Sequence, residues 1–308
     1  MRRRLVAHLR RRGYLHDRRI GRAFLEVPRE AFLPDELSKV GLPGVYRDDA
    51  IVTRRDPETR QPTSSSSQPA IMAVMLEMLD VQPGHRVLEI GAGTGYNAAL
   101  LAYLADPGGL VVTVDLDIDV AFAAARALRA LHVGAHVVVA DGARGMPGMA
   151  PIDRLEVTAS SDVVPRSWHE QLALGGRLVV PLRLSEAADR VHAVTAFVKV
   201  DGGFDSVAVT SGGFMPLRRP TVEVPEPEAE PDGEADDPTS TPPLTITPVW
   251  PVPEQPLRRG PWTDIARDDV SRLRIVVRYD ERRPPTRWAV RRDDHWIGID
   301  KVLPPART

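Results

Sequence analysis

The stretch Val87-Leu-Glu-Ile-Gly-Ala-Gly-Thr-Gly-Tyr96 decides the fold. A short apolar run leads into three closely spaced glycines, and an alanine- and leucine-rich segment, Asn97 to Leu104, follows them. This order is typical of a buried strand, a tight loop and a helix, which form the first unit of a parallel α/β sheet. Glycine lets such a loop adopt turn angles and approach a ligand closely, because it has no Cβ. The stretch therefore predicts a ligand site at the end of the strand.

An acidic residue at a defined distance indicates what that ligand is. Asp115 lies twenty positions after Gly95 and ends the next apolar run. A carboxylate at this spacing can accept hydrogen bonds from both hydroxyls of a ribose. A dinucleotide fingerprint requires glycine at the sixth position of G-x-G-x-x-G, where this chain has Tyr96. The run E-x-G-x-G-x-G from Glu89 to Gly95 instead resembles motif I of S-adenosylmethionine (SAM) methyltransferases. SAM is therefore the predicted cofactor, and NAD is the alternative.

The composition excludes several classes of protein. With 43% hydrophobic residues, the 308-residue chain can form a sizeable core, and its length predicts one large domain with a smaller one. A formal net charge of −2 argues against a general binder of nucleic acid or membrane surfaces. The absence of cysteine excludes disulfides and thiolate sites, and the eight histidines show no metal-ligand spacing. Without a membrane-spanning apolar run or a signal-peptide pattern, we expect a cytoplasmic protein with no metal.

Hydrophobic patterns predict the order of the elements. Helices are expected within the first 40 residues and at 70–79, before the glycine-containing stretch. Further strands are expected at 110–114, 135–140, 155–158 and 177–181, with helices at 121–131 and 167–172, and a final hairpin at 192–200 and 206–214. Strands and helices that alternate and then end in a hairpin predict an α/β fold with a mostly parallel sheet and an antiparallel edge.

The composition changes at Arg219. Residues 221–240 carry eight acidic residues, no basic residue and several prolines, and such a segment cannot form a core. We expect a methyltransferase domain at 1–219, with N-terminal helices and a substrate loop at 1–80 and the core at 81–219. An acidic, proline-rich linker is expected at 220–250. A small C-terminal β-rich module at 251–308, with strands at 273–279 and 287–299, is expected to help hold a substrate.

A serine-rich segment precedes the helix expected at 70–79. It reads Thr63-Ser-Ser-Ser-Ser67-Gln-Pro69. One interpretation is a flexible linker. The other is a hydroxyl-rich loop over the ligand site, since ligands of open α/β sheets bind beyond the carboxyl ends of the strands.

Five segments, in order, resemble the protein-L-isoaspartate O-methyltransferase family. They are Val27–Pro34, Ser67–Pro69, Val87–Asn97, Gln171–Pro181 and Gly213–Leu217. The resemblance covers roughly residues 1–219. It implies a Rossmann-like SAM methyltransferase with a mostly parallel, seven-stranded sheet that methylates a carboxylate.

The resemblance also implies roles for individual residues. Ser67 matches the family's active-site serine, Asp115 its ribose acid and Asp141 the acid near the adenine. Because an aspartyl carboxylate is already ionised at pH 7, it needs no general base, and the hydroxyls of Ser66 and Ser67 can position it. The predicted cofactor-binding residues are Glu89, Gly91, Ala92, Gly93, Thr94, Gly95, Asp115, Leu116, Asp141 and Gly142. The predicted substrate-binding residues are Ser65, Gln68, Thr158 and Ser160.

Two departures from the family pattern affect the expected substrate. The segment before Ser67 lacks the usual threonine and isoleucine, and the compact repair enzymes have no tail beyond 220. Both features resemble specialised members that methylate an aspartate in ribosomally made peptide natural products, so that the ester collapses to a succinimide (aspartimide). We therefore expect peptide tailoring, with a peptide or protein bearing Asp or isoAsp as the partner. The alternatives are repair of L-isoaspartyl residues in damaged proteins and a SAM-binding partner protein without activity. The oligomeric state is not predicted.

Overall fold

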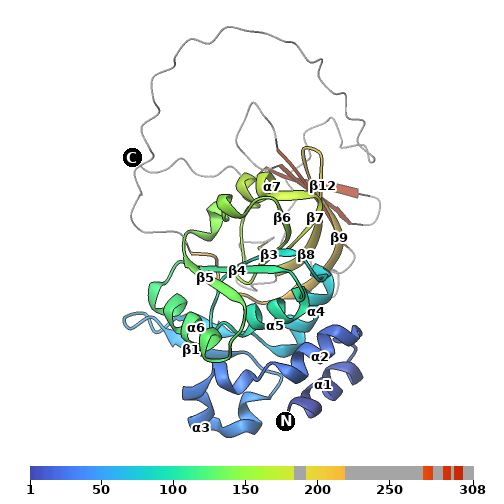
Figure 1. Ribbon diagram of the computed structural model, residues 1–308. Coiled ribbons are helices and arrows are strands. Elements are labelled where there is room, and N and C mark those ends of the chain that lie inside the picture. Colours follow the sequence, from blue (N-terminus) through green and yellow to red (C-terminus); the bar gives the residue numbers. More distant parts are fainter. Residues whose placement is uncertain (184–191, 219–272, 280–286, 293–294, 301–308) are drawn as a thin grey trace, which may run out of the picture.

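A mixed β-sheet with helices on both faces forms the centre of the molecule (Figure 1). The computed structural model describes residues 1–183, 192–218, 273–279, 287–292 and 295–300. In this part of the chain, no helix is long and apolar enough to cross a membrane.

Five parallel strands form the core of the sheet, in the spatial order β5-β4-β3-β6-β7. They are β3 (Arg86–Ile90), β4 (Leu110–Asp115), β5 (Ala135–Val139), β6 (Ile152–Val157) and β7 (Leu172–Arg183). Next to β7 lies the predicted antiparallel hairpin of β8 (His192–Val200) and β9 (Gly203–Gly212). These seven strands are the sheet that the resemblance implied, and the α/β Rossmann-like fold is confirmed.

Alternate residues of the strands belong to two hydrophobic clusters, one on each face of the sheet. On β3, for example, Val87 is part of one cluster and Leu88 is part of the other, because successive strand side chains point to opposite faces. The first face is covered by α4 (Pro69–Leu79), α5 (Tyr96–Ala105) and α6 (Ile118–Ala130). The second face is covered by α7 (Arg166–Gln171), whose Trp168 is fully buried. Short 3-10 turns, η2 (Gly142–Arg144) and η3 (Pro147–Met149), connect β5 to β6.

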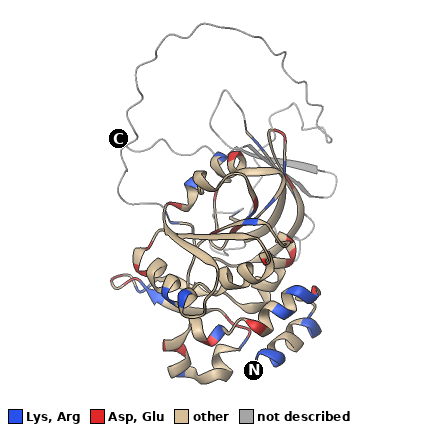
Figure 2. Cartoon of the chain, viewed as in Figure 1, with Lys and Arg blue, Asp and Glu red and all other residues tan. Residues whose placement is uncertain are grey.

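The N-terminal segment is helical, as predicted. It comprises α1 (Arg2–Arg11), α2 (Arg18–Glu26), the 3-10 turn η1 (Arg29–Phe32) and α3 (Pro34–Val45). The side chain of Asp17 caps α2 by accepting bonds from the backbone N–H groups of its first turn. Basic residues gather on α1 and α2 (Figure 2), where Leu5, Leu9 and Phe24 are buried.

Most of the serine-rich segment is a β-strand, so it is not a flexible linker; its serines line the cavity at the ends of the strands, as the second interpretation expected, but from a strand and not from a loop. Pro62–Ser66 forms β2 and pairs antiparallel with β1 (Ile51–Arg55). Serine has little preference for strands. Pairing with β1, and burial of Ser64 and Ser66, determine the conformation instead.

Three C-terminal strands extend the sheet to ten strands. They are β10 (Arg274–Arg278), β11 (Arg287–Arg292) and β12 (His295–Asp300), and β10 pairs antiparallel with β9. Leu273, Ile275 and Val277 are buried against the second face of the sheet. The linker expected at 220–250 lies outside the described residues, and the division into domains stays a prediction.

Candidate active site

The glycine-rich loop after β3 is held close to both neighbouring strands. The backbone N–H of Gly91 donates to the carbonyl of Val114 on β4 at 2.8 Å. The hydroxyl of Thr158, which follows β6, lies 2.9 Å from the Gly91 carbonyl. Gly91 has a φ of +102°, and a Cβ there would lie 2.3 Å from the Thr158 hydroxyl. The loop can therefore pass between the strand ends only with glycine at this position.

Asp115, at the end of β4, faces this loop. Its Oδ2 accepts a hydrogen bond from the backbone N–H of Gly93 at 3.2 Å, and its Oδ1 accepts one from Asp117 at 3.0 Å. The side chain is 11% exposed, and Asp115 lines a cavity at the carboxyl ends of the strands. A carboxylate held in this way has lone pairs left to accept hydrogen bonds from ligand hydroxyls.

The cavity brings together most of the residues that the sequence predicted for the site. Its wall includes Ser65, Ser66, Ser67, Glu89, Gly91, Ala92, Gly93, Thr94, Asp115, Leu116, Gly142 and Thr158. It also includes residues that the sequence did not single out, among them Met72, Tyr96, Asn97, Met215, Leu217 and Arg218. The cavity therefore joins the glycine-rich loop, the β1–β2 hairpin and the segment 215–218.

Four predicted site residues do not line this cavity in the described structure. Gly95 is the N-cap of α5, and the Gln68 side chain donates to the carbonyl of Asp48 at 3.1 Å. The Asp141 side chain caps η2 by accepting from Ala143 N–H. Ser160 donates its backbone N–H to the carbonyl of Met215 at 2.7 Å. In this structure these residues hold the segments around the cavity, and their predicted roles in binding stay predictions.

The β1–β2 hairpin presents its serines to the cavity. Ser66 is 3% exposed, and its hydroxyl has no hydrogen-bond partner among the described residues. The Ser67 carbonyl accepts a hydrogen bond from the fully buried guanidinium of Arg29 at 3.1 Å. A Cβ at Gly93 would lie 3.2 Å from the carbonyl of Ser65, so the hairpin rests directly on the glycine-rich loop. Ser66 can thus offer its hydroxyl to a ligand held by that loop.

A buried polar cluster lies beneath the cavity. Asn97, in the first turn of α5, donates from Nδ2 to Glu89 at 2.8 Å and to Glu156 at 2.7 Å. Burial raises the pKa of Glu89 to about 8 and that of Glu156 to about 7. The sequence analysis missed Asn97 and Glu156. The signal for Glu156 was present, since it is an acid between two apolar residues of a predicted strand, as Glu89 is.

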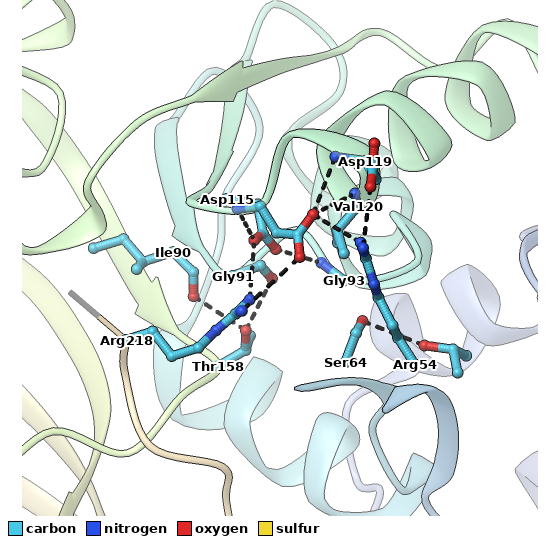
Figure 3. A network of polar contacts seen from close by, with 12 residues as sticks. Arg54, Ser64, Ile90, Gly91, Gly93, Asp115, Asp119, Val120, Thr158 and Arg218 are labelled. Atoms are coloured by element: carbon cyan, nitrogen blue, oxygen red, sulfur yellow. Dashed lines mark hydrogen bonds and ion pairs between the residues drawn. The ribbon is translucent and has the colours of Figure 1, made fainter. Parts of the chain in front are cut away.

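Two arginines connect distant segments to the acids near the loop (Figure 3). Arg54, on β1, contacts Asp117 at 2.8 Å and Asp119 at 3.0 Å. Arg218 lies 4.0 Å from Asp115 and 3.9 Å from Asp117. These contacts balance the negative charge of the β4–α6 turn and connect it to the hairpin. No sequence signal indicated either arginine, because each lies in a segment without periodicity.

The residues of the cavity fit SAM better than a dinucleotide. Asp115 suits ribose hydroxyls, and the buried Glu89 carboxylate, whose Oε2 lacks a partner among the described residues, suits a cationic group. The sixth position of the dinucleotide pattern is Tyr96, which is 1% exposed and packs against Phe32 with 5.7 Å between ring centroids. The glycine that a pyrophosphate site needs there is replaced by a core aromatic side chain.

Comparisons with known proteins agree with this geometry. The family model described as Protein-L-isoaspartate(D-aspartate) O-methyltransferase matches residues 1–218. The protein-L-isoaspartate O-methyltransferase of Methanopyrus kandleri is 42% identical over 183 residues, covering 59% of this chain and 76% of the relative. That of Hyperthermus butylicus is 37% identical over 227 residues, covering 70% and 88%.

Solved structures show the same similarity. A protein-L-isoaspartate O-methyltransferase structure is 36% identical, with a TM-score of 0.63, covering 71% of this chain and 66% of that chain. A Plasmodium falciparum protein described as a putative member, solved with S-adenosyl-L-homocysteine, is 18% identical, with a TM-score of 0.58, covering 70% and 96%. At this identity the second likeness concerns the fold alone.

Proposed function

The chain belongs to the protein-L-isoaspartate O-methyltransferase family, and we propose that it methylates the free α-carboxylate of L-isoaspartyl residues in peptides and proteins. As a member of this family, it is a SAM-dependent carboxyl methyltransferase. The relatives that it matches carry the isoaspartyl name. This supports isoaspartyl repair ahead of the tailoring of peptide natural products that the sequence had favoured.

The residues around the cavity divide the work of binding. SAM, when bound, supplies a methyl group activated on a sulfonium. The glycine-rich loop and Asp115 would hold its ribose side, and Glu89 would accept hydrogen bonds from its ammonium. Ser66 and Ser67 would hold the acceptor carboxylate, while Met72 and Leu217 supply apolar wall. The acceptor is ionised at pH 7, so no residue has to remove a proton, and the enzyme contributes alignment and partial desolvation.

One observation carries the proposal. The unpaired hydroxyl of Ser66 is buried in a hairpin that rests on the glycine-rich loop. A buried hydroxyl without a partner costs free energy, so a site that keeps one gains by binding an acceptor of hydrogen bonds. A carboxylate is such an acceptor, and hydroxyls can orient it without an opposing charge that would hold it too tightly before transfer.

The test uses three peptides of identical sequence with isoAsp, Asp or D-Asp at one position, incubated with SAM. We expect methyl transfer to the isoAsp peptide, detected by mass spectrometry, and little transfer to the Asp peptide. Ser66→Ala and Ser67→Ala should each lower kcat/KM by roughly 10- to 100-fold, the effect of one hydrogen bond to a charged group. Ser38→Ala is the matched control, because Ser38 is exposed on α3.

The other outcomes discriminate between the functions. Preferential methylation of the Asp peptide, followed by net loss of water, would support peptide tailoring. Binding of S-adenosylhomocysteine without methylation of any of the peptides would support a SAM-binding partner protein.

A further inference from the structure

Two acidic side chains share one amide group beneath the cavity. Glu89 on β3 and Glu156 on β6 are partners in the parallel register, so they lie side by side on the same face of the sheet. They are 0% and 1% exposed. The Nδ2 of Asn97 donates to both, at 2.8 Å and 2.7 Å. Three elements, β3, β6 and α5, therefore bring two carboxyl groups to a single donor.

The surroundings of this pair oppose two negative charges. No Lys, Arg or His in the described part of the chain forms an ion pair with Glu89 or Glu156. On β4, Asp115 is another acid that raises the pKa of Glu89, whereas the neutral Thr113 hydroxyl lowers it, and α5 contributes only the neutral Asn97. Burial is the largest cause of the raised pKa of Glu89, and the Glu156 carboxylate acts in the same direction. A buried carboxylate without a cation binds a proton instead.

Only one of the two acids lines the cavity. Glu89 and Asn97 line the cavity, whereas Glu156 does not. Among the described residues, Glu89 Oε2 and Asn97 Oδ1 have no hydrogen-bond partner. Two buried acceptors side by side at a cavity wall suit a cationic donor with several N–H groups, such as the ammonium of an amino acid.

We propose that Glu156, which lies beside Glu89 and shares Asn97 with it, is a positioning residue that keeps Glu89 protonated in the free enzyme, and that binding of the cofactor's ammonium releases this proton. The proposal rests on the proposed function, which places SAM in this cavity. On binding, the O–H bond of Glu89 breaks and the proton passes to the buffer. The resulting carboxylate accepts hydrogen bonds from the ammonium and from Asn97. Cofactor affinity therefore depends on pH through the ionisation of Glu89, which Glu156 influences.

The test is isothermal calorimetry of S-adenosylhomocysteine binding to the full chain, in buffers that differ in ionisation enthalpy. This ligand has the same amino-acid ammonium and transfers no methyl group. We expect release of about one proton per ligand near pH 6.5, falling toward half a proton near pH 8 as Glu89 ionises in the free enzyme. The buffer dependence of the enthalpy is the readout, and it is independent of catalysis.

Two variants test whether the released proton comes from Glu89 and whether Glu156 affects its release. Glu156→Gln keeps the side-chain shape and an acceptor for Asn97, but removes the neighbouring acid, so Glu89 should ionise at lower pH. Near pH 7.5 we expect proton release to fall by about half or more relative to wild type. Glu89→Gln should release no proton and weaken binding about tenfold or more. Glu170→Gln, at an exposed surface ion pair, is the control and should behave as wild type.

Each result decides a different point. If S-adenosylhomocysteine does not bind, the proposed function fails. If it binds with an enthalpy independent of the buffer, the proton-release inference is overturned while the proposed function stands. If Glu156→Gln binds the ligand with an unchanged pH profile, the role assigned to Glu156 is overturned.

Discussion

Gly91 is tightly constrained by its surroundings in the site. Its φ is +102°, and its carbonyl lies 2.9 Å from the Thr158 hydroxyl. Any side chain at this position would have to push the loop away from the end of β6 or displace Thr158. Since the loop also carries Gly93, whose N–H donates a hydrogen bond to Asp115, the displacement would reach Asp115. A side chain at Gly91 would therefore disturb both the backbone of the loop and the proposed cofactor site.

We expect Gly91→Ala to weaken binding of S-adenosylhomocysteine by about tenfold or more, measured by calorimetry. It should also lower the free energy of unfolding by roughly 1–2 kcal/mol, the usual cost of a side chain at positive φ. Gly134→Ala is the matched control, because a Cβ there meets nothing within 4 Å and its φ is not positive. Wild-type affinity in Gly91→Ala would contradict the close approach of loop and ligand.

The two buried acids predict how stability depends on pH. An acid whose pKa is raised on folding binds its proton more tightly in the folded state. Its contribution is therefore complete below the unfolded pKa, near 4.5, and is lost as pH rises through the folded pKa, about 8 for Glu89 and about 7 for Glu156. The ligand-free protein should lose thermal stability between about pH 6 and pH 8.

Thermal denaturation across this range, in wild type and Glu156→Gln, checks the prediction. The variant retains one buried acid, so its melting temperature should fall less steeply with pH. Saturating S-adenosylhomocysteine should also flatten the wild-type profile, because the ligand compensates the charge of Glu89. Parallel profiles for the two proteins would show that Glu156 does not titrate in this range.

At the scale of helices and strands, the sequence predicted those features that local sequence patterns encode. The strand, the glycine-rich loop and Asp115 at the end of β4 follow from apolar runs and fixed spacing, and the structure contains them. The sequence could not predict that a serine run forms β2, because pairing with β1 determines this conformation. Nor could it predict that Arg54 reaches Asp117, sixty-three residues away. Such contacts exist only once the fold brings distant segments together.

The pairing of β9 with β10 is a contact that no local sequence pattern indicated, and Gly203 offers a test of it. Gly203 begins β9 and pairs with Arg278 of β10, and a Cβ there would lie 2.0 Å from the carbonyl of Val277. We expect Gly203→Ala to displace the start of the β9–β10 ladder and lower the melting temperature. Hydrogen exchange at residues 274–278 should increase, while affinity for S-adenosylhomocysteine stays at the wild-type value. Val207→Thr, on the same strand and 56% exposed, should change neither property.

At the scale of the whole molecule, the C-terminal strands complete the sheet. Tyr279 packs against His169, with 5.1 Å between ring centroids, and its hydroxyl donates to the carbonyl of Val164 at 3.1 Å. The β10 side chains Ile275 and Val277 are fully buried. The sequence predicted strands here and a role in holding substrate. In the order of the sheet, β10 is separated from β3 by β9, β8, β7 and β6, which favours a role in stability.

A chain ending at Arg218 separates these two roles. Burial of Leu273, Ile275 and Val277 contributes roughly 1.5–3 kcal/mol per side chain, an upper bound, against a typical total of about 5–15 kcal/mol. We therefore expect the shortened protein to melt at a much lower temperature, or to aggregate, because removal of β10 would expose the apolar face of the sheet against which its side chains pack. The full-length variant Ile275→Ala should show a milder loss of about 2–5 kcal/mol in chemical denaturation, with KM for the isoaspartyl peptide unchanged. If the shortened protein instead keeps its melting temperature and only its KM rises, then the C-terminal strands hold substrate and β10 adds little to the stability of the core.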